Sequence, residues 1–473
     1  MSETNDFSNM PGPWGWPLFG SALQLTSFAE KTLLNWANQH YGNIFRYKMF
    51  NQDCVVLNGY DAIKEGLLTN KSEMSGRITG PLFEAIRDNR GLFFIQYGDS
   101  WKKWKPFLVK SVASVMPDLP QIICEQADEF LSEDLNDFIE NGESVALGDY
   151  LLYRMAQVVF LSCMNKEFLS KKKMELQELV SDIYAPLTNI KFSILWFAPS
   201  LSYFPPFSSF LADESTRRSK IVNRIIALIE EHRQEKRSHM KDLTCFFFEE
   251  YPEPDQGDLE SLALIFMDMI SAGSATVANQ LMWVILFLSK HPDMMGEVQH
   301  EIEEGMKGYE SIWDLYKCQE KVPFLKAVIQ ETMRLRPIAP GSLYHRTISD
   351  TKVGGYKIPK DVVIHPNLWS VHHDLKYWGP DVEAFRPDRH LDKDGKFVKS
   401  DHVIPFSIGE RKCTGKPIAE ADIFVFLATI MLRYDVSLDP EYEDVDMTGI
   451  SSAILKPPDY KVRLTYRQTK QNL

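Results

Sequence analysis

Apolar positions along the chain recur mostly at the three-to-four-residue spacing of amphipathic helices. This spacing predicts helices over Phe28–Tyr41, Gln121–Asn141 and Ile221–Lys236, and a longer helix over Leu259–Lys290. Asp268 is the only charged residue between Ser261 and Ser289, so the long helix is predicted to be buried along much of its length. We therefore expect a protein built mainly from helices.

Shorter stretches alternate between apolar and polar residues and predict strands. They cover Asn43–Met49, Asp53–Leu57, Lys352–Ile358, Val362–Pro366 and Val462–Tyr466. The expected fold class is mainly α with a small β subdomain, drawn from the N-terminal part and the region after residue 340. We expect residues 1–20 to form a polar start and a proline-rich hinge, and residues 21–473 to form a single domain.

Composition narrows the possible functions. The chain has 473 residues, is 44% hydrophobic and carries a formal charge of −13, which argues against nucleic acid because phosphate affinity comes from lysine and arginine. Its six cysteines include no C-x-x-C pair, as expected in a reducing compartment with one functional thiol and five structural ones. The polar start predicts no signal peptide, and no membrane-spanning run is predicted.

One cysteine stands in an informative local sequence. Cys413 lies near the end of the loop Pro405–Gly415, just before a helical pattern, where the helix dipole and free N–H groups favour a thiolate. Phe406 can shield the sulfur, Gly409 lets the backbone approach a flat ligand, and Arg411 supplies a positive charge. This arrangement is expected of an axial thiolate on haem iron.

The loop resembles the F-x-x-G-x-R-x-C-x-G pattern of the cytochrome P450 family of haem-thiolate monooxygenases. The chain fills that pattern at Phe406, Gly409, Arg411, Cys413 and Gly415. The resemblance runs from Pro11 to near Tyr466 and is closest to the animal microsomal branch that metabolises drugs and steroids. It implies the cytochrome P450 fold, with a long central helix over haem b and Cys413 as the iron ligand.

The long predicted helix carries Ser271-Ala272-Gly273-Ser274-Ala275-Thr276 at its middle. Taken alone, these small residues favour close packing against another helix. The family has A-G-x-acid-T at this place, so Thr276 resembles its proton-relaying hydroxyl. Ala275 replaces the acid, and Ser274 or ordered water is left to substitute for it.

Further motifs match in the family's order. Glu331 and Arg334 form E-x-x-R, which in isolation is most often a weak exposed ion pair. Arg389, in F-R-P-D-R, resembles the third member of the family's buried triad. The resemblance implies that this triad fixes the loop that presents Cys413.

Haem propionates need cationic or hydrogen-bonding partners. The resemblance implies four places for them: Trp101 with Lys105, Arg90, His345 and Arg411. Lys105 stands where the family has arginine, so the bidentate fork is lost. The alternative is that Arg90 and Lys105 are solvated charges and His345 is a hydrogen-bonded core histidine.

The resemblance also implies partners and a location. An NADPH-dependent flavoprotein reductase, with cytochrome b5 as a second donor, would bind a basic face of Lys102, Lys103, Lys105, Lys110, Lys412 and Lys416, unless these are ordinary solvated lysines. The apolar segment 191–207 resembles a mobile lid with peripheral membrane contact, although part of the core is an equal alternative. The expected location is the cytosolic face of the endoplasmic reticulum membrane. Because no anchoring helix precedes the hinge in this sequence, a soluble cytoplasmic protein is the alternative.

Three functions remain open at this level. The first is a monooxygenase that inserts one oxygen atom from O2 into a hydrophobic small molecule, such as a lipid, steroid or xenobiotic. The second, motivated by Ala275, is a haem-thiolate isomerase or peroxygenase that acts on a hydroperoxide. The third is a non-catalytic haem sensor or carrier.

Overall fold

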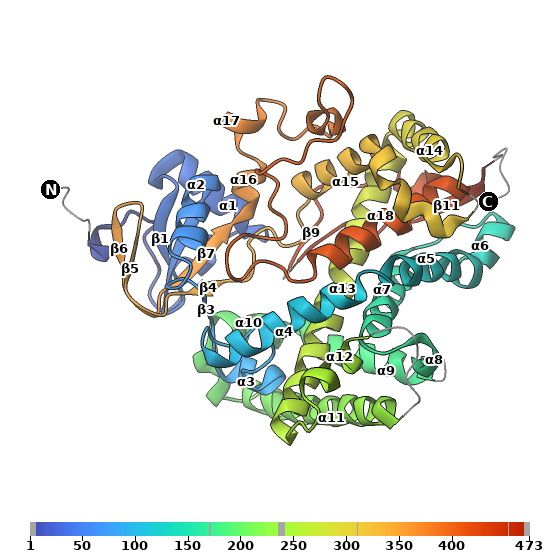
Figure 1. Ribbon diagram of the computed structural model, residues 1–473. Coiled ribbons are helices and arrows are strands. Elements are labelled where there is room, and N and C mark those ends of the chain that lie inside the picture. The colour runs from blue at the N-terminus through green and yellow to red at the C-terminus, as the bar shows by residue number, and fades with distance from the viewer. Residues whose placement is uncertain (1–5, 170–171, 235–241, 310, 453, 468–473) are drawn as a thin grey trace.

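The long helix α13 (Gln256–Lys290) runs through the middle of the molecule, and other helices pack around it (Figure 1). Asp255 starts it by accepting a hydrogen bond from the N–H of Asp258 at 2.8 Å. The computed structural model describes residues 6–169, 172–234, 242–309, 311–452 and 454–467. A small sheet lies at one end of the helical part (Figure 1). The predicted fold class is confirmed.

The remaining helices, in chain order, are α1 (Ala29–Trp36), α2 (Gly59–Lys64), α3 (Pro81–Arg87), α4 (Asp99–Val115), α5 (Leu119–Glu129), α6 (Asn136–Asn141), α7 (Gly148–Cys163), α8 (Lys166–Leu169), α9 (Lys173–Tyr184), α10 (Ile190–Phe197), α11 (Phe207–Gln234), α12 (Leu243–Glu250), α14 (Pro292–Met306), α15 (Pro323–Leu335), α16 (Leu368–His372), α17 (Leu375–Trp378) and α18 (Lys416–Arg433). Shorter helical turns that matter below are η3 (Ala37–Tyr41), η4 (Glu65–Thr69), η5 (Phe130–Asp134), η8 (Pro199–Tyr203) and η10 (Pro387–His390).

The strands are β1 (Ile44–Met49), β2 (Gln52–Asn58), β3 (Gly76–Arg77), β4 (His345–Arg346), β5 (Thr351–Val353), β6 (Tyr356–Ile358), β7 (Val363–Asn367), β8 (Tyr434–Leu438), β9 (Ile450–Ser451), β10 (Leu455–Lys456) and β11 (Val462–Tyr466). The main sheet has the order β1-β2-β7-β4-β3, in which β2 and β7 run parallel and the other neighbours antiparallel. It thereby joins the N-terminal part of the chain to the region after residue 340.

The predicted helices are present, but their ends differ. The helix predicted over Phe28–Tyr41 is formed by α1 and η3. The helix predicted over Ile221–Lys236 is part of α11, which begins earlier, at Phe207. Predicted residues 235 and 236 lie outside the described residues. The second is divided into α5, η5 and α6. The turn η5 and the helix before it gather Glu129, Glu133 and Asp134 around the buried guanidinium of Arg154, which explains the irregular backbone there.

The predicted strands also need adjustment. The stretch 352–358 forms a hairpin of β5 and β6, because Gly354 and Gly355 adopt positive φ angles of 57° and 87° and reverse the chain. Strand β11 pairs with β8, which the alternating pattern did not predict. The proline-rich start packs along β1, where the N–H of Arg46 donates to the carbonyl of Pro11 at 2.8 Å. The division at residue 20 stays a prediction.

Among the described residues, α13 is the one unbroken helix whose length and composition would allow it to cross a bilayer. Most of this helix is buried inside the protein, as is usual for a core helix. The pair formed by α4 and the chain from Leu119 to Asp134 passes the same test only if it is taken together, and it is bent by 71°.

Candidate functional site

The cysteine loop is closed by its own backbone. The N–H of Cys413 donates to the carbonyl of Phe406 at 3.0 Å, and the Phe406 ring lies 5.5 Å from the Lys416 ammonium. Gly409 has a φ of 85°, and a Cβ atom there would collide with the carbonyl oxygen of Leu67 in η4. Its missing side chain therefore admits the backbone of Leu67. The approach of a flat ligand to the backbone of Gly409 stays a prediction.

The thiol of Cys413 differs from the other five. Cys413 is exposed, whereas four cysteines are buried and Cys245 is half-buried. Burial raises the pKa of Cys54 and of Cys124 to about 12. The pKa of Cys413 is also raised, because protein surrounds the loop, but the N–H groups of Gly415 and Lys416 at the start of α18 act in the opposite direction. Donors aimed at the sulfur are what an anionic ligand sulfur needs.

Arg411 is held without a carboxylate. Its Nε donates to the carbonyl of Ser75 at 2.8 Å, and its Nη2 donates to the carbonyl of Ile95 at 2.7 Å. Its guanidinium lies over the indole of Trp101, with Cζ 4.9 Å from the ring centroid. Burial, followed by the charge of Arg77, lowers the pKa of Arg411 to about 8.

Lys105 connects helix α4 to the cysteine loop. Its ammonium donates to the carbonyl oxygen of Glu410 and lies 3.5 Å from the Glu410 carboxylate. The same ammonium is 4.5 Å from the centroid of the buried Trp101 ring. The structure therefore brings Trp101, Lys105 and Arg411 together.

His345 and Arg77 face each other across the pair of strands β4 and β3. Nδ1 of the buried His345 is 2.7 Å from the carbonyl oxygen of Met74, and burial together with the charge of Arg77 holds the pKa of this histidine well below its usual value. Arg77 donates to the carbonyls of Phe93 and Tyr344 at 3.0 and 3.1 Å. Burial lowers the pKa of Arg77 to about 10.

Arg77, His345 and Arg411 thus form a group of basic side chains, which we call the basic cluster. Among the described residues, no carboxylate pairs with either guanidinium, and their hydrogen bonds go to backbone carbonyls. Buried charges are normally paired, because an isolated one is costly. The donor set therefore suits an anionic group with more than one carboxylate.

The structure does not bring Arg90 to this cluster. Its Nε lies 2.9 Å from Asp88 and its Nη1 lies 2.9 Å from Glu260 near the start of α13. The side chain is 41% exposed. The two neighbouring acids already satisfy this guanidinium at the surface, which corrects the expectation for Arg90.

Arg77 was missed because the sequence around it gives little signal. It sits in a strand of two residues, too short for an alternating pattern to be visible. Its partner strand comes from His345, far along the chain. The one available hint was an arginine directly before the apolar stretch that leads into α3.

At the middle of α13 the predicted hydroxyls bond within the helix. Thr276 donates to the carbonyl of Ala272 at 2.5 Å, and the buried Ser274 donates to that of Ile270 at 2.6 Å. A hydroxyl from outside the helix also reaches this turn. Tyr184, the last residue of α9, donates to the carbonyl of Ser271 at 2.8 Å and accepts from the N–H of Ala275 at 3.2 Å. Nothing in the residues around Tyr184 predicts this contact.

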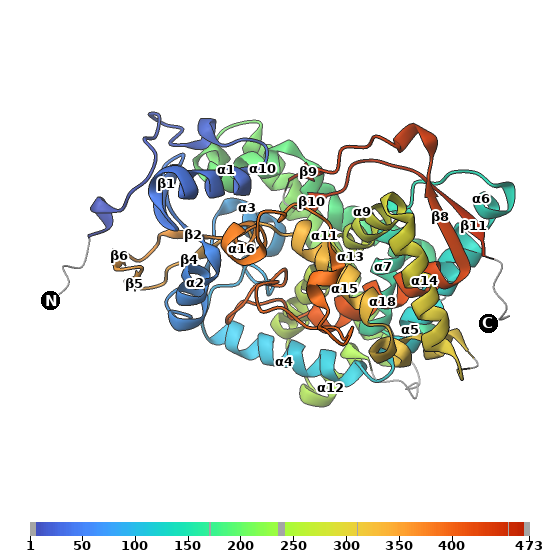
Figure 2. The same ribbon diagram turned by 90° about the horizontal axis from the view of Figure 1, so that it is seen from above.

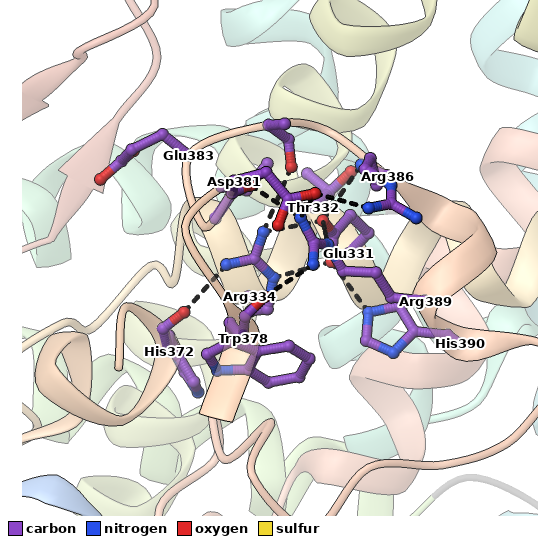
Figure 3. Close-up of polar contacts among 12 residues, drawn as sticks. Glu331, Thr332, Arg334, His372, Trp378, Asp381, Glu383, Arg386, Arg389 and His390 are labelled. Atoms are coloured by element: carbon purple, nitrogen blue, oxygen red, sulfur yellow. Dashed lines mark hydrogen bonds and ion pairs between the residues drawn. The ribbon is translucent and has the colours of Figure 1, made fainter. Parts of the chain in front are cut away.

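The E-x-x-R residues form a buried network (Figure 3). Arg334 makes two hydrogen bonds of 2.7 Å to Glu331 in α15, and both side chains are fully buried. Arg389 lies 3.5 Å from Glu331 and donates to the carbonyls of Trp378 and Asp381. Sequence reasoning missed His390, whose Nε2 lies 2.9 Å from Glu331.

A second histidine links this network to the chain that leads into the cysteine loop. Arg334 donates to the carbonyl of His372 at 2.9 Å. Burial lowers the pKa of His372 to about 3, so its ring is neutral and its Nε2 accepts a hydrogen bond of 2.8 Å from the N–H of Ile404. Ile404 in turn accepts from the N–H of Ser407 at 2.9 Å. The buried network therefore reaches the start of the loop by hydrogen bonds.

Comparison with known proteins agrees with this geometry. The sequence model of the family "Cytochrome P450" matches residues 10–464. The chain belongs to the cytochrome P450 family. The predicted family, enzyme class and cofactor, haem b, are thereby confirmed. The thiol at the start of α18 and the basic cluster fit an iron ligand and two propionates, so the residues present suit this cofactor.

Animal cytochromes P450 are among the similar proteins. Cytochrome P450 2C44 of Mus musculus is 28% identical over 97% of this chain and 93% of its own length. The steroid 17-alpha-hydroxylase/17,20 lyase of Squalus acanthias is 29% identical over 96% of this chain and 91% of its own. Cytochrome P450 1A1 of Canis lupus familiaris is 28% identical over 94% of this chain and 88% of its own length.

Two arginines make a discriminating pair for haem binding. We expect Arg77→Gln to weaken haem retention about ten- to a hundredfold, since a hydrogen bond to a charged group contributes about 1.5–3 kcal/mol. Arg90→Gln, which only frees two surface acids, is the matched control and should retain haem normally. The rate of haem transfer to apomyoglobin measures this, and circular dichroism checks folding. Haem loss in Arg90→Gln with normal retention in Arg77→Gln would reverse the assignment.

The buried Glu331 network predicts a dependence of stability on pH. Burial alone would raise the pKa of Glu331, but hydrogen bonds from Arg334 and His390 bring it below the ordinary value of 4.5. Its ionised form therefore stabilises the fold above that pH, and the contribution is lost as the pH falls through the folded-state pKa. Glu331→Gln should lower the unfolding free energy by about 3–5 kcal/mol near neutral pH, because Arg334 is left unpaired.

Chemical denaturation of wild type and Glu331→Gln at a series of pH values measures this difference, which should shrink below pH 4.5. Asp381→Asn is the control, because it removes exposed contacts with the same Arg389 and should change stability far less. A difference between wild type and Glu331→Gln that stayed constant down to strongly acidic pH would contradict the role given to the ionised carboxylate.

Proposed function

We propose that this cytochrome P450 inserts one oxygen atom from dioxygen into a hydrophobic small molecule, with electrons that come from NADPH through a flavoprotein reductase. The observation that carries the proposal is the position of the exposed Cys413 beside a basic cluster that has no carboxylate of its own. Two electrons and two protons reduce dioxygen so that one oxygen atom enters the substrate and the other leaves as water.

Each part of the chain has a task in this proposal. Haem b, when bound, supplies the iron on which dioxygen is activated. Cys413 holds the metal, with the N–H groups of Gly415 and Lys416 steadying the sulfur. Arg77, Arg411 and His345 hold the propionates, and Trp101 and Lys105 support Arg411 from α4. Thr276 orients protons beside the reacting oxygen.

Aromatic packing supports a hydrophobic substrate. Three aromatic rings pack on one another: Phe83 of α3, Phe94 of the loop after α3, and Trp196 of α10. The ring centroid of Phe83 lies 4.7 Å from that of Phe94 and 5.0 Å from that of Trp196. The ring centroid of Tyr344 lies 6.4 Å from that of Trp196. These rings join α3, the loop that follows it and the lid segment in one apolar cluster. We infer that a hydrophobic molecule binds beside this cluster. Lipids, steroids and xenobiotics have this chemistry.

The electron donor is proposed to bind on the side of α4 and the cysteine loop (Figure 2). Lys102, Lys110 and Lys412 are exposed there. The other predicted lysines have acidic partners: Lys103 pairs with Asp258, Lys105 with Glu410 and Lys416 with Glu420. Exposed lysines on the side of the molecule that carries Cys413 suit acidic electron donors such as a flavoprotein reductase and cytochrome b5.

Contact with the cytosolic face of the endoplasmic reticulum membrane is proposed through the lid segment. Tyr203 and Phe204 are 79% and 62% exposed, and Trp14 and Leu18 of the hinge are 67% and 86% exposed. Phe197 and Leu201 of the lid segment pack against the same apolar cluster as Leu25, which follows the hinge. Clustered exposed aromatic and aliphatic side chains favour insertion into a lipid surface.

The alternative of a hydroperoxide-using isomerase or peroxygenase still rests on Ala275, which offers no carboxylate. Such an enzyme does not activate dioxygen, because its substrate already contains the O–O bond, so it needs no protons for that step. The two functions are separated by what drives turnover, which the following experiment tests.

The protein is expressed with added haem precursor, reduced and exposed to carbon monoxide. We expect the absorption band of a thiolate-ligated haem, and its loss in Cys413→Ser. Ethoxycoumarin is then supplied as a probe with NADPH, microsomal reductase and isotope-labelled dioxygen, and separately with cumene hydroperoxide. Labelled product in the first reaction supports the monooxygenase. Turnover with the hydroperoxide alone would favour the alternative, and haem binding without turnover in either reaction would favour a sensor or carrier.

Membrane contact makes a separate prediction. Replacing both Tyr203 and Phe204 with Asp should lower binding to phosphatidylcholine–phosphatidylserine vesicles by at least about tenfold, because burial of each large apolar side chain contributes about 1.5–3 kcal/mol. The matched control replaces Leu375 and Tyr377 of α17, which are exposed to 58% and 49%, in the same way. Co-sedimentation measures binding, and equal losses in both double variants would contradict a specific role of the lid.

A further inference from the structure

The turn of α13 that lacks the family's acid receives a hydroxyl from another helix. The Tyr184 oxygen, at the end of α9, lies between the carbonyl of Ser271 and the N–H of Ala275. These two groups are the ends of one backbone rung of the helix, four residues apart. Tyr184 also hydrogen-bonds to the Ser274 side chain. Its phenol therefore contacts the backbone or side chain of several residues around position 275.

The acid nearest in sequence on α13 is already engaged. Asp268 lies two turns before Ala275, and its Oδ1 is 2.9 Å from Nε of Arg87. Its Oδ2 accepts from the N–H of Phe93 at 3.1 Å. Both oxygens therefore fix the loop after α3 onto α13. They are committed to that contact, so this carboxylate does not replace the one missing at position 275.

A phenol has the chemistry that this position needs. A hydroxyl donates and accepts at once, so it can give up one proton inward and take one from the solvent side, starting and ending neutral. Burial raises the pKa of Tyr184, which keeps the phenol protonated across the physiological range. Tyr184 is half-buried, so part of this residue is accessible to solvent.

We propose that Tyr184 is a positioning residue that takes over, from α9, the role of the carboxylate absent at Ala275 and supports proton delivery on the Thr276 side of α13. This inference rests on the proposed monooxygenase function. It adds that residues of two helices, α9 and α13, form the proton pathway. The packing of α9 against α13 then controls how much product is formed per NADPH consumed. One proton enters at the phenol for each proton that leaves it, and no bond between heavy atoms changes.

The test uses holoenzyme with Tyr184→Phe, which keeps the ring and removes only the hydroxyl. Tyr153→Phe is the matched control, because that hydroxyl bonds to Gln157 within α7, away from the Ala275 turn. Product per NADPH, with ethoxycoumarin as the probe, should fall by about tenfold in Tyr184→Phe, less than the ~10²-fold typical of a whole general acid, because solvent partly replaces the phenol. Turnover driven by cumene hydroperoxide, which bypasses proton delivery to dioxygen, should stay near wild type.

Two further measurements distinguish a role of Tyr184 in proton delivery from a role only in stabilising the fold. Hydrogen exchange in resting protein should accelerate for the peptide that contains Ala275, because its N–H loses an acceptor. Adding Ala275→Glu to Tyr184→Phe should restore coupling by supplying the missing carboxylate. Unchanged exchange, a parallel fall in both kinds of turnover, or a failure of the added glutamate to restore coupling would each overturn the proposal.

The outcome is distinguishable from failure of the proposed function. A wild-type protein without the thiolate band and without NADPH-driven product would remove the monooxygenase function before any variant is compared. A wild-type protein that shows both, with coupling unaffected in Tyr184→Phe, would leave the monooxygenase in place and remove only the role of Tyr184.

Discussion

Two guanidinium groups that lack a carboxylate partner within the described chain set the conditions for the rest of this molecule. Arg77 and Arg411 donate hydrogen bonds to carbonyls of the segment 92–95 and of Ser75 and Tyr344. Burial lowers the pKa of both groups, and the charge of Arg77 lowers that of Arg411 further. Charges so placed are costly unless an anion accompanies them. Arg411 lies two residues before Cys413, so the cluster offers positive charge where an anionic cofactor would bind.

The rest of the architecture makes that placement rigid. The loop cannot drift, since Gly409 rests against the backbone of Leu67 and Lys105 holds Glu410. Arg334, paired with Glu331, donates a hydrogen bond to the carbonyl of His372. The ring of His372 accepts a hydrogen bond from the N–H of Ile404, just before the loop. A ligand atom supported by locked neighbours keeps its geometry without reorganising when the metal changes state.

Sequence patterns were informative where the signal is local. The spacing around Cys413, the E-x-x-R pair and the long apolar run of α13 each lie within one segment, so family, fold class and cofactor could be predicted. Whether an arginine points inward is decided by distant partners. Arg77 faces His345 across a strand pair, whereas Arg90 meets Glu260, and nothing in the residues beside either one reveals this. Tyr184 was missed for the same reason, because its contact lies 91 positions away.

The parallel pairing of β2 with β7 has a consequence for how the chain is made. Asn58 and Asn367 are register partners and hydrogen-bond through their side chains at 2.8 Å, although they lie 309 positions apart. At ribosomal speeds of about 5–20 residues per second, the early strands wait about 15–60 s for their neighbour. During that wait the edge of β2 that later pairs with β7 is open, although its other edge can already pair with β1. Arg77 and His345 pair in the same sheet, so the basic cluster is complete only after the chain has been made beyond residue 345.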